Sequence, residues 1–180
     1  MKLLLHSCCG PCSVYPIDNL RENGISVTGF FYNPNIHPFK EFRRRLTTAE
    51  EYSKQIGMTL IADTSYGLIT FLRAVVNRES ERCLYCYQDR LKTTVQMAKK
   101  EGFDSFSTTL LYSKYQNHLK IKQICEELSR EYSLAFHYED FRVGWQAGIQ
   151  KSIDLNMYRQ PYCGCIYSEQ ERYDKTLSTR

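Results

Sequence analysis

The sequence predicts an α/β fold, in which a doubly wound, mostly parallel five-stranded sheet has helices on both faces. Short apolar runs that suit buried strands alternate along the chain with longer segments whose apolar residues recur at helical spacing. Turn-forming residues, mainly glycine, asparagine and proline, separate the two kinds of segment. The chain has 180 residues, of which 42% are hydrophobic, so it can bury one core. We therefore expect a single domain over residues 1–180 with a helical extension at its C-terminal end.

The first half of the chain contains three predicted strands, each followed by a predicted helix. The strands are the apolar runs Lys2–Leu5, Val27–Tyr32 and Met58–Ala62. The helices cover about residues 13–23, 38–56 and 68–76, and glycines directly follow the first two. Pro38 suits the first turn of the second helix, because that turn has no hydrogen-bond partner for a proline nitrogen to lose.

The second half continues the alternation. A helix is expected to begin near Cys86 and to stop at Gly102, and a second helix should cover about residues 121–132. The fourth and fifth strands are predicted at Phe103–Leu111 and Leu134–Tyr138. From residue 144 the sequence is typical of a helix, then of a loop over residues 159–167. A last short helix is expected to open with a capping box formed by Ser168 and Glu171.

Charge and targeting signals narrow the class of protein. The formal net charge of +4 is compatible with a phosphate-bearing partner only if the lysines and arginines gather on one face. Leu3–Leu5 is far shorter than the apolar core of a signal peptide, and no apolar run reaches the length of a membrane span. We expect a cytoplasmic protein without a membrane partner, in which the eight cysteines stay reduced.

Seven of the eight cysteines fall in three short groups on predicted turns. They are Cys8, Cys9 and Cys12 after the first strand, Cys83 and Cys86 at a helix start, and Cys163 and Cys165 in the late loop. In doubly wound sheets ligands bind beyond the carboxyl ends of the strands, so the groups could converge there with Asp140, which ends the fifth strand. Seventy residues separate Cys12 from Cys83, which indicates a site built by the whole fold, and seven sulfurs exceed the four that one zinc ion needs. An iron–sulfur cluster, alone or with a second metal, would use more of them.

Other roles remain open for several of these residues. Cys125 lies on the apolar face of its predicted helix, so we expect a buried thiol that binds no metal. Asp140 could instead cap a helix or pair with a cation, and His6 suits a hydrogen-bonded core histidine. Arg43–Arg45 is more typical of a solvated helix face than of a substrate contact. Cys12, or the pair Cys163 and Cys165, could form a redox disulfide in place of metal bonds.

The motifs of the chain resemble those of one family. These are His6-Ser7-Cys8-Cys9-Gly10-Pro11-Cys12, Tyr32-Asn33-Pro34-Asn35-Ile36, Cys83-x-x-Cys86, Asp140-Phe141-Arg142 and Tyr158-Arg159-Gln160-Pro161-Tyr162-Cys163-Gly164-Cys165. Together they are similar to the QueH family of cobalamin-independent epoxyqueuosine reductases. The resemblance spans nearly the whole chain.

The resemblance implies a nucleotide-hydrolase-like (HUP-like) Rossmann-type fold and an oxidoreductase that reduces epoxyqueuosine to queuosine at the wobble position of tRNAs with GUN anticodons. It also implies a [4Fe–4S] cluster with an adjacent mononuclear metal, expected to be iron, held by the seven grouped cysteines, and no cobalamin. Asp140 would complete the second metal's ligands at the reacting centre. Arg142 and Arg159 are candidates by position for tRNA phosphates. The electron donor is not identified by the sequence.

Two other functions compete with this one. An ATP-dependent tRNA-modifying enzyme of the same fold would need a phosphate loop rich in glycine and serine after the first strand, where this chain has cysteines and only Gly10. A zinc-stabilised RNA-binding module would use some of the same thiols without catalysis.

Overall fold

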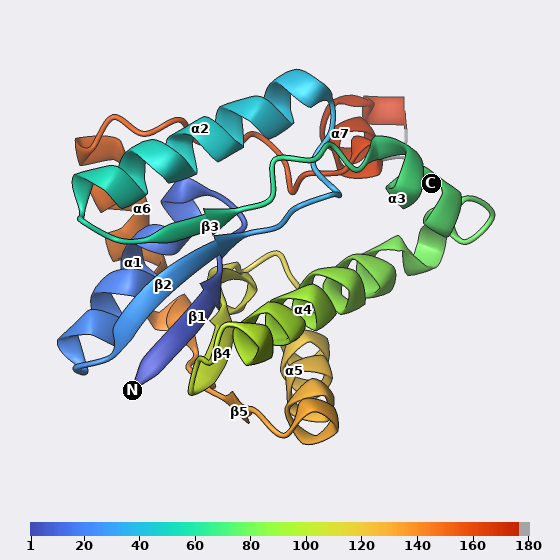
Figure 1. The fold of residues 1–180 in the computed structure, drawn as a ribbon. Helices are drawn as coiled ribbons and strands as arrows, with labels where there is room; N and C mark the ends of the chain where they lie inside the picture. Colours follow the sequence, from blue (N-terminus) through green and yellow to red (C-terminus); the bar gives the residue numbers. More distant parts are fainter. Residues whose placement is uncertain (177–180) are drawn as a thin grey trace.

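A computed structural model of the chain describes residues 1–176. It contains one sheet of five parallel strands in the order β3-β2-β1-β4-β5, with β1 in the centre (Figure 1). The strands are β1 (Lys2–His6), β2 (Ser26–Phe31), β3 (Leu60–Ala62), β4 (Ser105–Thr108) and β5 (Ala135–Phe136). In register, Leu3 of β1 lies between Val27 of β2 and Ser105 of β4. The predicted α/β class and doubly wound parallel sheet are confirmed.

Helices cover both faces of this sheet. Three lie on one face: α1 (Gly10–Glu22), α2 (Phe39–Gln55) and α6 (Trp145–Asp154). Two lie on the other: α4 (Arg82–Lys100) and α5 (His118–Tyr132) (Figure 1). Two short helices, α3 (Leu68–Val75) and α7 (Ile166–Tyr173), sit together beyond the carboxyl ends of the strands. The structure therefore places the C-terminal helical segment, predicted as an extension, over the edge where ligands bind in such sheets.

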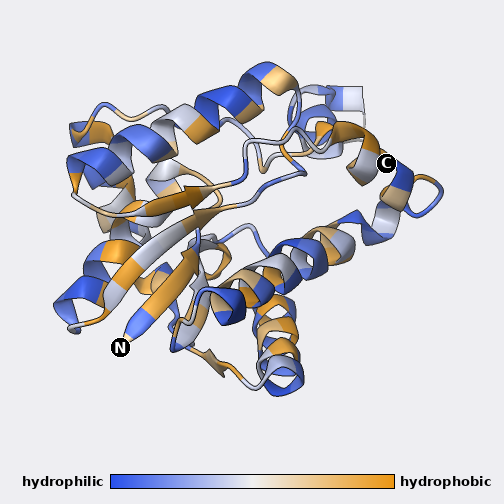
Figure 2. Cartoon of the chain, viewed as in Figure 1, coloured by the Kyte–Doolittle hydropathy of each residue, from blue (hydrophilic) through white to orange (hydrophobic). Residues whose placement is uncertain are grey.

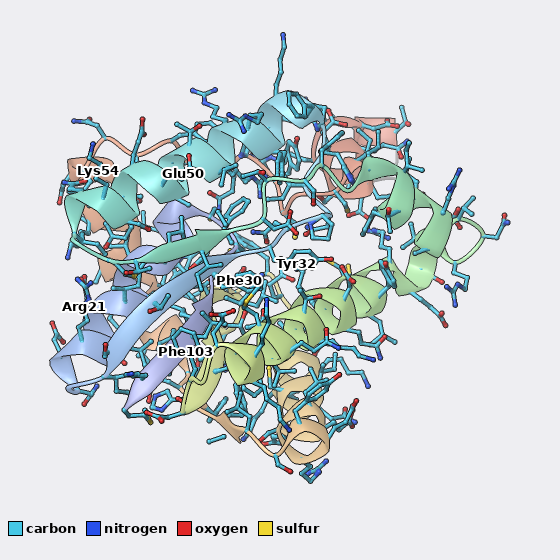
Figure 3. All side chains as sticks on the ribbon, in the orientation of Figure 1. Arg21, Phe30, Tyr32, Glu50, Lys54 and Phe103 are labelled. Carbon is cyan, nitrogen blue, oxygen red and sulfur yellow. The ribbon has the colours of Figure 1, made fainter. Side chains whose placement is uncertain are left out.

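The main core lies between the sheet and its two helical layers, where side chains fill the space between the ribbons (Figure 3). Leu3, Leu4 and Leu5 of the central strand are fully buried because helices pack on both sides of it. Colouring by hydropathy shows apolar strands and helices that are apolar on one side only, as expected for helices packed on a sheet (Figure 2). No helix in residues 1–176 is both long enough and apolar enough to cross a bilayer.

Several predicted boundaries were wrong. The fifth strand covers only Ala135–Phe136 instead of Leu134–Tyr138, so Asp140 does not directly follow it. The fourth strand ends at Thr108, and residues 109–112 form a 3-10 helix, η2 (Thr109–Tyr112), because the Thr108 hydroxyl caps the nitrogen of Leu110 at 3.1 Å. The last helix begins at Ile166, and the predicted capping box does not form. Ser168 instead bonds to the carbonyl oxygen of Cys165 at 2.7 Å, whereas Glu171 pairs with Arg82.

Candidate metal centre at the carboxyl edge of the sheet

The first thiol group occupies the point where the strand order reverses. Cys8 follows central strand β1, and its backbone nitrogen donates to the hydroxyl of Thr109, which follows the neighbouring strand β4, at 3.1 Å. Cys9 is the extended N-cap of α1, and a proline in the first turn fixes that helix start. The sulfurs of Cys8, Cys9 and Cys12 lie within 4.8 Å of one another, with 3.8 Å between those of Cys8 and Cys9. Sequence reasoning placed this group correctly at the switch point.

The pKa values of the three thiols in this group are shifted in opposite directions. Hydrogen bonds from Cys12 and Cys9, assisted by Thr109, hold the pKa of Cys8 well below its ordinary value. Burial raises the pKa of Cys9, and hydrogen bonds to Cys8 and Cys9 raise that of Cys12. A bound cation would favour the thiolate form of all three side chains.

The other four grouped thiols form a second assembly. Cys86 and Cys165 pack together with Phe71 and Val75 of α3 in one small apolar cluster. Burial raises the pKa of Cys86 to about 12, and Cys163, Cys165 and Cys83 act electrostatically on the same thiol. The four side chains are therefore neighbours, although they come from two segments more than 75 residues apart.

All three cysteine groups lie at helix N-termini. Cys9 is the N-cap of α1, Cys165 is the N-cap of α7, and Cys83 and Cys86 belong to the first five residues of α4. Free backbone N–H groups and the helix dipole favour negative charge at such ends. The N-terminal ends of these three helices would therefore favour the thiolate form of the cysteines beside them.

Arg90 is a buried cation between the two thiol assemblies. Arg90 is 2% exposed. It interacts electrostatically with Cys86 and Cys163 of the second assembly and with Cys8 of the first. Its hydrogen bonds go to neutral oxygens of Cys86 and Asn33, at 3.2 and 3.4 Å, and its Nη2 has no partner among the described residues. A buried guanidinium without a carboxylate partner is costly unless an anion lies near it. The neighbouring thiols, as thiolates, would supply that anion.

A second buried arginine fixes the C-terminal thiol segment. Arg45 of α2 donates to the carbonyl oxygens of Cys163 at 2.6 Å and Tyr162 at 2.9 Å, and its Nε donates to Glu41 at 2.6 Å. Glu41 also accepts from the hydroxyl of Tyr158 at 2.5 Å. Desolvation acts to lower the pKa of Arg45, but the nearby Cys9 and Glu41 outweigh it and leave the pKa raised. The loop that carries two thiols is thus bound to α2 at both of its ends.

Two glutamine amides donate directly to sulfur. Gln160 Nε2 lies 3.0 Å from the sulfur of Cys12, and Gln116 Nε2 lies 3.1 Å from that of Cys163. N–H donors aimed at sulfur stabilise thiolates and tune the potential of any cluster that they hold. Neither glutamine was singled out from the sequence.

Comparison with known proteins decides the family. Residues 3–171 match the sequence model of a family described as "Epoxyqueuosine reductase QueH". The chain belongs to the QueH family. A relative from Dehalococcoides mccartyi with that name is 37% identical, covering 98% of this chain and 97% of its own. One from Thermotoga maritima is 33% identical, covering 96% and 93%. The resemblance read from the motifs is confirmed, and the relatives' name supports a reductase.

A solved structure shares the fold of this QueH chain. It is a predicted subunit of a tRNA methyltransferase from Methanocaldococcus jannaschii, with a TM-score of 0.55 and 12% identity, covering 85% of this chain and 76% of its own. At that identity the likeness shows a common α/β architecture and nothing about chemistry.

The structure gives Asp140 strong contacts away from the first thiol group. Its carboxylate accepts from the backbone nitrogen of Arg142 at 3.1 Å and from its guanidinium at 2.8 and 2.6 Å. It thereby caps η3 (Phe141–Gly144), and the Arg142 hydrogen bonds lower the pKa of the carboxyl to about 2. Both non-catalytic roles left open by the sequence are present. Its predicted place at the reacting centre of a QueH enzyme stays a prediction.

The other candidates divide between core and surface. Cys125 is fully buried in the main core, and burial raises its pKa, as expected for a thiol that binds no metal. His6 is fully buried between Thr108 and the carbonyl oxygen of Tyr32, at 3.0 and 3.2 Å, which confirms a hydrogen-bonded core histidine. Arg159 is exposed and free to meet an anion.

Sequence reasoning missed the two buried arginines. Arg45 was assigned to a solvated helix face, which is wrong for this residue although right for Arg43 and Arg44. The signal was present, because position 45 falls on the apolar stripe of α2 at helical spacing with Phe42, Leu46 and Ala49. Arg90 likewise falls on the buried stripe of α4. A charge on an apolar stripe indicates a buried partner, and here the partners lie in other segments.

Proposed function

We propose that this chain reduces epoxyqueuosine to queuosine at the wobble position of tRNAs with GUN anticodons, the last step of queuosine biosynthesis, with residues 1–180 acting as one domain. The observation that carries the proposal is two groups of thiols beside buried arginines. The sulfurs of Cys8, Cys9 and Cys12 lie within 4.8 Å of one another, and Cys86 interacts electrostatically with Cys83, Cys163 and Cys165. Arg90 interacts with thiols of both groups, and Arg45 interacts with Cys9 and Cys163. Family membership supplies the substrate class, because the relatives are named epoxyqueuosine reductases.

The donor set fits an iron–sulfur cluster beside a second metal. Cys83, Cys86, Cys163 and Cys165 match in number and type the ligands of a [4Fe–4S] cluster. The 3.8 Å between the sulfurs of Cys8 and Cys9 is about the separation of two thiolates on one tetrahedral ion, given metal–sulfur bonds of about 2.3 Å. We assign the first group to a mononuclear metal, proposed to be iron, with a position left open for substrate. The proposal needs no cobalamin.

The reaction converts an epoxide, two electrons and two protons into an alkene and water. When bound, the cluster would supply single electrons and the second metal would act as a Lewis acid toward the departing oxygen. The chain's own residues hold these groups. Arg90 and Arg45 balance the thiolate charge inside a buried site, and the amides of Gln116 and Gln160 donate to sulfur. An external donor of two electrons is required.

Residues at the edge of the site would meet the RNA. Arg159 is exposed in the segment that carries Gln160, and Arg142 lies in η3, which follows β5 along the chain. Both are proposed to contact phosphates, a role that several cations share in RNA-binding enzymes. Asp140 is proposed to act at the reacting centre, which would require its carboxylate to leave the ion pair with Arg142.

Packing over Gly10 argues against an ATP-dependent enzyme. A Cβ atom placed on this residue would lie 2.7 Å from the Met157 side chain and 2.8 Å from that of Thr48. The cavity beside Gly10 is too small to hold a water molecule. A phosphate-binding loop needs open space for its ligand, and at Gly10 the side chains of Thr48 and Met157 occupy the space beside the backbone.

Metal analysis after anaerobic purification tests the proposal against a zinc-stabilised RNA-binding module. We expect a brown protein with about four acid-labile sulfides and about five irons per chain. Cys86→Ala should lose sulfide and colour, Cys8→Ala should keep most sulfide and lose about one iron, and Cys125→Ala should lose neither. One zinc with no sulfide would overturn the redox function. Sulfide loss in Cys8→Ala with retention in Cys86→Ala would reverse the assignment of the two groups.

Conversion of the substrate tests the reaction itself. Epoxyqueuosine-containing tRNA is incubated anaerobically with the loaded protein and a strong chemical reductant, and its nucleosides are quantified by mass spectrometry. Queuosine should appear with wild type and not with Cys86→Ala. A protein with the expected iron and sulfide that leaves epoxyqueuosine unchanged would contradict the proposed reaction.

A further inference from the structure

A row of aromatic rings leads from the first thiol group to the surface. Tyr15 stacks on Tyr112 with 6.4 Å between ring centroids, Tyr112 lies 5.0 Å from Trp145, and Trp145 lies 5.7 Å from Tyr115 at an interplanar angle of 77°. Tyr112, inside the protein, is 3% exposed and interacts electrostatically with Cys12 and Cys9 of the first thiol group. At the outer end Tyr115 is 87% exposed. The last ring is thus presented to solvent by a packed aromatic support.

The segment that carries Tyr115 borders the second thiol assembly and is held in place. The neighbouring Gln116 donates to the sulfur of Cys163 at 3.1 Å and accepts from the hydroxyl of Tyr87 at 2.7 Å. The same hydroxyl accepts from the backbone nitrogen of Asn117 at 3.3 Å. The exposed ring is therefore fixed beside the thiols by contacts on its C-terminal side and by Trp145 beneath it.

The surroundings of the ring carry positive charge. Residues 113–125 include three lysines, of which Lys122 pairs with Glu126 at 3.8 Å, whereas Lys114 and Lys120 have no carboxylate partner among the described residues. Lys114 is exposed, with its ammonium 5.8 Å from the centre of the Trp145 ring. Helix α5 begins within this segment, at His118, with no acidic residue in its first turn. A cationic surface around an exposed flat ring matches a ligand that combines phosphates with unpaired bases.

We propose that Tyr115, supported by Trp145, stacks on an unpaired base of the substrate RNA, while Lys114 contacts a phosphate beside that base. This inference rests on the proposed function for the identity of the RNA, an anticodon loop. Base stacking on an aromatic ring is tolerant of sequence, because every base has a π-face. The ring would thus position the loop with its wobble nucleotide at the thiol site, and specificity for the modified base would remain with the site itself.

The single tryptophan makes this contact directly measurable. The chain has one tryptophan, so its fluorescence reports on position 145 alone. The metal-loaded protein is titrated, at fixed salt, with a hairpin RNA of an anticodon arm carrying guanine at the wobble position. We expect RNA binding to quench the tryptophan fluorescence of the wild-type protein. Tyr115→Ala should lose about 5- to 150-fold in RNA affinity, the range for replacing one base-stacking aromatic side chain with alanine. Tyr115→Phe should bind as wild type does.

Two further variants separate stacking from other kinds of contact. Lys114→Ala should lower the slope of log affinity against log salt by about one, as expected for one lost phosphate contact. Leu119→Ala, which truncates a side chain 78% exposed at the second position of α5, should leave RNA affinity unchanged. Equal weakening by Leu119→Ala and Tyr115→Ala would show a general apolar docking surface and overturn stacking.

Failure of this inference is distinguishable from failure of the proposed function. Wild-type affinity and quenching in Tyr115→Ala, together with normal epoxyqueuosine conversion, would remove the stacking role and leave the reaction intact. Weakened RNA binding by Tyr115→Ala, together with a wild-type protein that converts no epoxyqueuosine, would support the RNA-binding surface and contradict the proposed reaction.

Discussion

Arg45 Nη1 donates to the carbonyl oxygen of Cys163 at 2.6 Å, across 118 positions of sequence. The backbone of the loop that carries Cys163 and Cys165 is therefore bound to a side chain from the N-terminal half of the sequence. Arg45 and Glu41 are both buried, at 2% and 9% exposure, so neither can exchange its partner for water.

Arg45→Met should destabilise the protein and release the C-terminal thiols. Leaving Glu41 buried without its cation should lower the free energy of unfolding by about 3–5 kcal/mol. In the metal-free protein Cys163 should also become more reactive toward iodoacetamide, measured by peptide mass spectrometry against Cys125. Arg43→Met, on the exposed face of the same helix, is the matched control and should change neither quantity. Unaltered Cys163 reactivity in Arg45→Met would mean that other contacts hold the loop.

Asp140→Asn separates charge from capping. The amide oxygen of asparagine can still accept from the backbone nitrogen of Arg142, so η3 should keep its cap and folding should change little. If the carboxylate acts at the reacting centre, epoxyqueuosine conversion should be lost while affinity for the anticodon hairpin and sulfide content remain. Conversion at the wild-type rate would leave Asp140 with the cap and the ion pair as its whole role.

His37 should make stability depend on pH between about 6.5 and 4. Burial lowers its pKa from 6.5 to about 4, since Tyr66 and Phe71 enclose the ring. Below pH 6.5 the unfolded chain gains a proton that the folded chain takes up only near pH 4. The contribution of His37 to the free energy of unfolding is therefore complete above pH 6.5. It falls by about 3 kcal/mol as the pH drops to 4.

Urea unfolding of the metal-free protein at a series of pH values measures this effect. His6 and other buried histidines add their own dependence, so the difference between wild type and His37→Asn isolates one group. Between pH 6.5 and 4, the free energy of unfolding of the variant should depend on pH less steeply than that of wild type, by about 1.4 kcal/mol per pH unit. Parallel curves for the two proteins would show that His37 titrates normally in the fold.

Cys125→Ala should behave as a core substitution only. The thiol is fully buried against the main core, so its removal should cost on the order of 1 kcal/mol. Iron, sulfide and conversion should match wild type when normalised to folded protein. A proportional loss of iron in this variant alone would give Cys125 a role in the site that its position does not indicate.

Much of the fold could be predicted because its elements follow local patterns. The central strand was correct to within one residue, since Lys2–Leu5 is apolar and a turn follows at once. The predicted bounds of α2 were also correct to within one residue, because Gly57 marks the end of the helix. Errors came where a side chain overrides propensity, as when the Thr108 hydroxyl starts a 3-10 helix inside an apolar run.

The site was only partly predictable, for a different reason. Cysteine spacing and the topology of a doubly wound sheet located the thiols of Cys8, Cys9 and Cys12, because both rules are local or general. The pairing of Arg45 with the loop at Cys163, and the place of Arg90 between two thiol assemblies, depend on segments that meet only in the folded chain. No spacing in the sequence states which segments those are.

The thiols of the site begin at Cys8 and end at Cys165, so the donor set spans almost the length of the described chain. During synthesis the early cysteines leave the ribosome long before the late ones exist. If all seven thiols bind metal as proposed, the complete donor set exists only after Cys163 and Cys165 have been synthesised and packed against the rest of the fold. A chain that ends before residue 163 would then lack two of the proposed ligands.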